Sequence, residues 1–135
     1  MPKEDYLLKY IEKLNRVIAA MLGFREKGFP EDAIRLAQEA YTELLDIDLD
    51  VLSAISNNEF NGVLTQHNYS HTHIEALAEI LFQTANAYNE LNINVKAESF
   101  YSKSLQTLLH LNTKDRTFSM EREERINELR ELIKG

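Results

Sequence analysis

Thiols and helix-breaking residues are scarce in this sequence. Its 135 residues include no cysteine, two prolines and four glycines. Without cysteine the chain forms no disulfide and no thiolate metal site, which favours a reducing compartment. The prolines and glycines lie near apparent helix ends and β-branched residues do not cluster, so the composition favours helix throughout. We expect a single all-α domain over residues 1–135, long enough to bury a core.

Basic charge and long apolar runs are also lacking. The sequence has 15 lysines and arginines against 22 aspartates and glutamates, a formal charge of −7. This balance disfavours nucleic acid and anionic membrane surfaces as partners. No segment approaches the ~20 apolar residues of a membrane span, and the charged N-terminal segment lacks the apolar run of a signal peptide. We therefore expect a cytoplasmic protein with no nucleic-acid and no membrane partner.

Catalytic and cofactor motifs are absent as well. The sequence has no glycine-rich dinucleotide motif, no phosphate loop, no His-Glu-x-x-His and no Gly-x-Ser-x-Gly. An enzyme that uses Tyr88 or Tyr101 is one hypothesis, but core packing explains both side chains better. We predict that the protein is not an enzyme and needs no cofactor.

Amphipathic helices are what the sequence does contain. The first should run from about residue 2 to 27, with its apolar side chains three or four apart, and Gly28 should end it. Pro30 opens a second helix whose alanines allow close packing. We expect these two helices to form an antiparallel hairpin over about residues 3–46. The apolar arc of the first helix is wider than one neighbouring helix can cover.

An insert at residues 47–69 should follow this hairpin. Leu49, Leu52 and Ile55 predict a short helix, with Asp48 or Asp50 as its N-cap. Asparagines and a glycine indicate turns next, and a second short helix near residues 60–66 is left open.

A second hairpin is predicted over about residues 70–111, followed by a C-terminal helix. Thr72 and Glu75 fit a capping box at its start. Asn92 or Asn94 should mark the turn to its second helix, at about residues 95–111. The last helix, at about residues 117–134, should bury a thin stripe: Phe118, Ile126, Leu129 and Ile133.

The two hairpins share one pattern of large, small and aromatic residues at a constant offset. In the first the pattern falls on Val17, Met21, Phe24, Gly28, Ala33, Ala37 and Ala40. In the second it falls on Leu81, Ala85, Tyr88, Asn92, Ala97, Tyr101 and Ser104. Small residues at these places let two helices cross closely while large ones fill the groove beside them.

This pattern resembles the tetratricopeptide repeat (TPR) over roughly residues 15–46 and 79–111. The whole chain also resembles an uncharacterised family of small bacterial helical proteins, through Asp5-Tyr6-Leu7-Leu8 with Ile11-Glu12 and through the helix Glu39 to Leu45. The resemblance implies antiparallel hairpins stacked in a TPR-like arrangement of about 5–7 helices, but supplies no function. Met21 departs from the pattern, and the insert separates the two hairpins.

The resemblance also implies where a partner would bind, because the first helix of each TPR hairpin lines the inner face. Basic residues of carboxylate-gripping TPR domains are replaced here by Ile18 and Phe82, so we do not expect carboxylate capture. The predicted partner-binding residues are Ile18, Leu22, Phe82, Asn86 and Asn89. They would form a groove for an amphipathic helix. Alternatively, the insert or the last helix covers them as core.

Self-association is an equal alternative for the wide apolar arc of the first helix, since symmetric dimers commonly bury such surfaces. Our leading hypothesis is thus a non-enzymatic interaction protein that forms a homodimer or binds a partner helix. The alternative is a small metal- or ligand-binding protein that uses His67, His71 and His73, which could hold zinc or nickel. In a helix that begins near Ser70, His71 and His73 would point apart, so we predict no metal site.

Overall fold

The computed structural model describes residues 3–66 and 69–134. In this part of the chain the regular structure consists of seven helices and no strand, which confirms the all-α class. The helices are α1 (Lys3–Glu26), α2 (Pro30–Leu45), α3 (Leu49–Ala54), α4 (Asn57–Gln66), α5 (His71–Glu90), α6 (Asn94–Lys114) and α7 (Met120–Lys134). Both short helices of the insert are therefore present. None of the described helices is long and apolar enough to cross a membrane.

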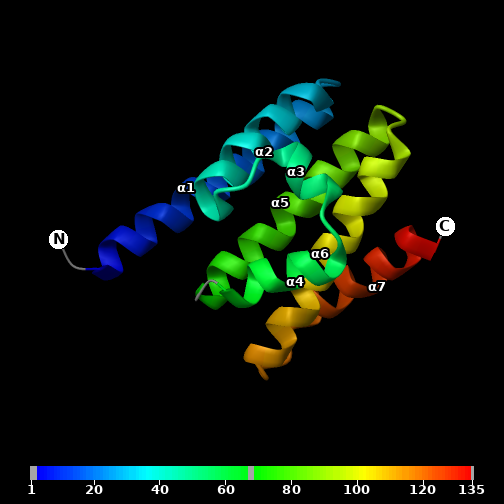
Figure 1. Ribbon diagram of the computed structural model, residues 1–135. Helices are drawn as coiled ribbons and strands as arrows, with labels where there is room; N and C mark the ends of the chain where they lie inside the picture. The colour runs from blue at the N-terminus through cyan, green and yellow to red at the C-terminus, as the bar shows by residue number, and fades with distance from the viewer. Residues whose placement is uncertain (1–2, 67–68, 135) are drawn as a thin grey trace.

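The helices form two antiparallel hairpins that lie against each other (Figure 1). The first hairpin, α1 and α2, packs on α5 of the second, and α5 packs along α6. The short helices α3 and α4 contact α6, and α7 packs on α6 further along the chain. The insert thus covers the second hairpin and does not separate it from the first.

The turns of both hairpins use left-handed residues. Gly28 has φ 86° and ends α1, as its position after the apolar stripe predicts. Asn92, with φ 61°, takes the same role between α5 and α6, which decides between the two asparagines considered. Asparagine tolerates this conformation better than most residues do.

One predicted helix cap is confirmed and another is wrong. The Asp48 carboxylate accepts the backbone N–H of Asp50 at 2.9 Å and caps α3. At α5 the cap is Ser70, whose hydroxyl accepts the N–H of His73 at 3.3 Å, and Thr72 lies inside the first turn. The Ser70 hydroxyl also bonds to Nδ1 of His73 at 2.6 Å. His73 thereby holds the Ser70 side chain from the helix, where a capping box would use Glu or Gln.

The core lies where the two hairpins cross. Ala33, Ala37 and Ala85 have no exposed surface, so the small residues of the shared pattern do sit at close helix contacts. Beside them Phe100 stacks on Tyr41 and on Tyr88, at ring-centre distances of 5.9 and 5.8 Å. Tyr88, the one of these three that belongs to the shared pattern, is therefore a core side chain.

The start of α7 differs from the prediction. The helix begins at Met120, because the Ser119 hydroxyl caps it by accepting the N–H of Arg122 at 3.2 Å. Phe118 therefore precedes the helix and is 74% exposed, so its assignment to the buried stripe was wrong. Ile126 and Leu129 are buried as expected.

Charged side chains attach α7 to its neighbours. The guanidinium of Arg122, in a residue only 8% exposed, donates to Asp115 at 3.0 Å, Asn112 at 3.0 Å and Glu75 at 3.4 Å. The hydrogen bond from the backbone N–H of Thr117 and then Arg122 lower the pKa of Asp115, which keeps the carboxylate charged. This cluster joins α7 to α5 and to the loop before α7.

Candidate interaction surface

Two arginines cross the predicted inner face along α5, one from α1 and one from α7. Arg25 of α1 donates to both carboxylate oxygens of Glu90, at 3.1 and 3.0 Å, and to the Gln83 side chain. Such two-point contacts fix the position of a guanidinium well. The α1 side of the face is therefore occupied by the protein's own side chains near the end of α5.

Phe82 lies under the second of these arginines. The guanidinium carbon of Arg125 is 3.7 Å from the centre of the Phe82 ring, and Phe82 is 5% exposed. Arg125 also donates to Glu79 at 2.9 Å, and the Tyr101 ring lies 6.0 Å from Phe82 on another side. The sequence left two interpretations of Phe82, a partner groove or a core position covered by the insert or the last helix. The second describes it, because Arg125 of α7 covers the ring.

The other four predicted partner-binding residues differ in exposure. Asn86 accepts a hydrogen bond from the Tyr101 hydroxyl, and Ile18 is partly buried. Leu22 is 41% exposed and Asn89 is exposed. Phe82, which would join these positions into an apolar groove, is covered. Partner binding through this face stays a prediction that rests on Leu22 and Asn89.

The histidines of the metal alternative do not form a metal site among the described residues. His67 lies outside the described residues. His71 is exposed, whereas His73 is 8% exposed, and burial lowers its pKa from the usual 6.5. Within residues 3–66 and 69–134, no group of three His, Cys, Asp or Glu side chains is placed to hold a metal ion.

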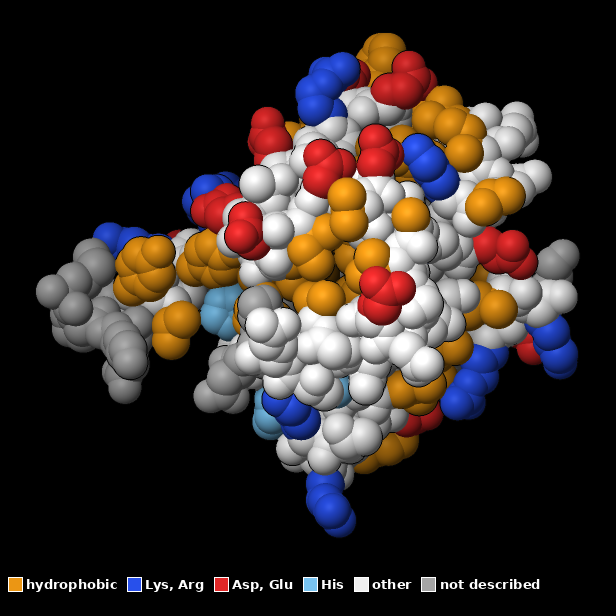
Figure 2. Space-filling model, viewed as in Figure 1, with side chains coloured by type: hydrophobic (Ala, Val, Ile, Leu, Met, Phe, Trp, Pro, Cys, Tyr) orange, Lys and Arg blue, Asp and Glu red, His pale blue; other side chains and the backbone are white. Residues whose placement is uncertain are grey.

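The start of α1 is an exposed apolar segment that projects from the molecule. Because α1 has 24 residues and α2 only 16, the first turns of α1 extend beyond the end of α2 (Figure 1). There Tyr6, Leu7 and Leu8 are 66%, 42% and 58% exposed. Figure 2 shows hydrophobic side chains along this projecting segment. We call residues 6–11 the α1 overhang.

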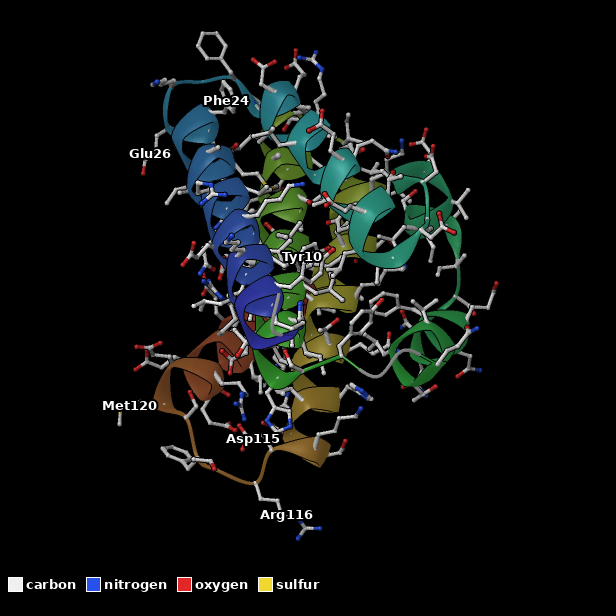
Figure 3. The ribbon with its side chains drawn as sticks, turned by 90° about the vertical axis from the view of Figure 1, so that its left-hand side faces the viewer. Tyr10, Phe24, Glu26, Asp115, Arg116 and Met120 are labelled. Atoms are coloured by element: carbon white, nitrogen blue, oxygen red, sulfur yellow. The ribbon has the colours of Figure 1, made fainter. Side chains whose placement is uncertain are left out.

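A cavity of about 320 Å³ lies at the base of the α1 overhang. Four aromatic side chains line it: Tyr6 and Tyr10 from α1, Tyr69 before α5, and His73 in α5. The Tyr10 and His73 rings are 5.3 Å apart, and those of Tyr69 and His73 are 6.4 Å apart. Figure 3 labels Tyr10 on the side of α1 that faces the other helices. We call this cavity the aromatic pocket.

The remaining wall of the aromatic pocket comes from α2 and from Leu7. Leu44 contributes apolar surface, and its carbonyl oxygen accepts the Tyr69 hydroxyl at 2.8 Å. Glu43 places a carboxylate at the edge, where Lys13 contacts it at 2.8 Å. Burial raises the pKa of Tyr69 to about 12, so its hydroxyl stays protonated at neutral pH.

Sequence reasoning anticipated a wide apolar arc on α1 but not the aromatic pocket. The overhang follows from the unequal lengths of the first two predicted helices, which was a usable signal. The pocket joins residues 6, 10, 43, 69 and 73, and no local pattern connects them. No family model matches the chain, and comparisons with curated proteins and with solved structures also find no match. The TPR resemblance therefore stays a prediction.

Proposed function

We propose that the protein is a non-enzymatic protein–protein interaction module that associates through the α1 overhang. The observation that carries this proposal is the exposure of three consecutive large apolar side chains, Tyr6, Leu7 and Leu8. Single exposed leucines are ordinary, but consecutive helix residues point about 100° apart, so these three side chains leave apolar surface on several sides of a projecting helix end, which is typical of an interface. A TPR-like arrangement is part of the proposal, supported by two hairpins that pack on each other in chain order.

A second copy of the chain is the partner we propose first. Two overhangs that pack across each other in a symmetric pair would cover the same apolar side chains on both copies. The exposed charges around them, Lys9 and Glu12, have opposite signs and so suit a symmetric contact. A partner helix of another protein would use the same surface.

Solution mass tests the proposal, measured by light scattering after size exclusion over a concentration series. The wild type should approach twice 15.7 kDa as concentration rises, and Leu8→Glu should stay monomeric. Leu8 is 58% exposed, so the substitution should leave the fold intact, as circular dichroism would verify.

Leu22→Glu is the matched control, because Leu22 is a 41% exposed leucine of the same helix on the predicted inner face. It should retain the wild-type mass. A dimer lost in Leu22→Glu but kept in Leu8→Glu would move the interface to the inner face. A wild-type monomer at every concentration would contradict self-association.

A further inference from the structure

The aromatic pocket combines aromatic rings with a carboxylate, and the described residues that line it include no lysine or arginine. Tyr6, Tyr10, Tyr69 and His73 supply the rings, and Glu43 supplies the negative charge. Aromatic faces carry partial negative charge and attract a cation within about 6 Å of the ring centre. A cage of several rings around one cavity is how proteins recognise ammonium groups that carry alkyl substituents.

Several of these side chains are already held in place. The Tyr69 hydroxyl donates to the Leu44 carbonyl oxygen at 2.8 Å, and Nδ1 of His73 lies 2.6 Å from the Ser70 hydroxyl. Tyr10 is fixed on a regular turn of α1 with its ring 5.3 Å from that of His73. Only Tyr6, 66% exposed, is positioned to move when a ligand enters. A preformed pocket with one adjustable wall is typical of small-ligand sites.

The electrostatics of the pocket also favour a cation. The Glu43 carboxylate lies close enough to Tyr10 to help raise the pKa of that phenol, after burial itself, so its field reaches the cavity. Lys13 contacts both oxygens of the Glu43 carboxylate, but the pair is exposed, with side chains 52% and 46% accessible, and such pairs contribute little stability. The formal charge of −7 attracts cations to the whole molecule.

We propose that the aromatic pocket binds an alkylated ammonium group, with Tyr6, Tyr10 and Tyr69 around its alkyl substituents and Glu43 as its counter-charge. Two sources can supply this group: a free quaternary ammonium compound, or a methylated lysine side chain of a partner protein. The site goes beyond the proposed association: it shares Tyr6 and Leu7 with the α1 overhang, but Leu8 does not line the pocket.

The first experiment compares choline with 3,3-dimethyl-1-butanol, which has the same shape without the charge. Both are titrated into the full chain and followed by backbone amide NMR. Choline should bind saturably, with shifts clustered at Tyr6, Tyr10 and His73, and at least roughly 5-fold more tightly than the alcohol. Equal affinity for the two compounds, or no shifts at these residues, would overturn the proposal.

Substitutions in the aromatic pocket test whether choline binds there. Tyr6→Ala and Glu43→Gln should each weaken choline binding by roughly 3- to 5-fold, whereas Tyr6→Phe should retain it, since the ring and not the hydroxyl is needed. Phe29→Ala is the matched control, because Phe29 is an exposed aromatic in the turn between α1 and α2 and does not line the pocket. Weakening by Phe29→Ala to the same extent as by Tyr6→Ala would overturn the assignment to this pocket.

Two further comparisons ask which source supplies the ammonium group and whether choline binding is distinct from self-association. Tighter binding of choline than of Nα-acetyl-Nε-trimethyl-lysine methylamide indicates a free ammonium compound, and the reverse order indicates a methylated lysine of a partner. At concentrations where the wild type is monomeric, Leu8→Glu should bind choline like the wild type. Loss of choline binding in Leu8→Glu, with the fold intact, would overturn the independence of the two sites.

Discussion

The two ends of the chain contrast in how they meet the rest of the molecule. The start of α1 is rich in large apolar side chains, yet Tyr6, Leu7 and Leu8 are left exposed. The last helix, α7, consists mostly of charged residues, yet it is attached along α5 and α6 through Arg122 and Arg125. Apolar content alone therefore does not decide which helix is covered. Unequal helix lengths leave the start of α1 exposed, whereas the buried Arg122 and the partly buried Arg125 attach α7.

The largest expected effect comes from breaking the α7 end. Arg122→Ala should lower the free energy of unfolding by about 2 kcal/mol, because it removes hydrogen bonds of a buried cation to Asp115, Asn112 and Glu75. Urea denaturation measures the effect as a lower midpoint at unchanged slope.

Arg116→Ala is the control for this prediction. Arg116 lies in the loop before α7, is exposed, and points away from the helices in Figure 3. Its removal should change stability by less than about 0.5 kcal/mol. Equal stability of the two variants would show that Arg122 does not hold α7, and its part in the contrast drawn above would fail.

Acidification should have a smaller effect on the free energy of unfolding, through His73 at the α1 end of the molecule. Burial holds the pKa of His73 below 6.5 in the folded protein, so the unfolded chain binds more protons as the pH falls through that value. The stability contributed by neutral His73 should therefore be present above about pH 6.5 and decline below it. Urea midpoints between about pH 7.5 and 5.5 measure this.

His110 shifts in the same direction, through burial and then Lys114, so a variant must separate the two histidines. The urea midpoint of His73→Gln should decline less on acidification than that of the wild type. The decline that remains comes from His110. An unchanged pH dependence in His73→Gln would mean that His73 titrates alike in the folded and unfolded chains.

The smallest expected effect is that of Leu8→Glu, which tests the contrast between the exposed start of α1 and the attached α7. Leu8→Glu should leave the unfolding free energy of the monomer within about 0.5 kcal/mol of wild type, since Leu8 is mostly exposed. Denaturation at a concentration where the wild type is monomeric provides the measurement. A loss above about 1 kcal/mol would place Leu8 in the folding core and contradict an unattached overhang.

Local patterns in the sequence predict most of the fold. Helical spacing locates α1, α2, α5 and α6, and Gly28 ends α1 because it takes a left-handed conformation without strain. The cap predicted at Thr72 lies instead at Ser70, two positions earlier, and the last helix begins after Ser119 and not at about residue 117. Neighbouring Ser and Thr residues have similar capping preference, so local spacing does not choose between them.

The candidate sites were harder to predict, because they depend on contacts between distant segments. Arg125 covers Phe82 from another helix, and the sequence around Phe82 does not predict this contact. The aromatic pocket likewise needs α1, α2 and the start of α5 in place together. The overhang was within reach of the sequence, because the second helix was predicted to be much shorter than the first.

The unequal lengths of α1 and α2 also have an evolutionary consequence. Leu14 is the first buried side chain of α1 among the residues whose burial is described, and Tyr10 is the first that packs against the core, so the turn before Tyr10 is under little selection for packing. Insertion or loss of one helical turn there would move the exposed tip by about 5.4 Å and leave the core untouched. Natural selection can therefore alter what this tip binds while it preserves the folded domain.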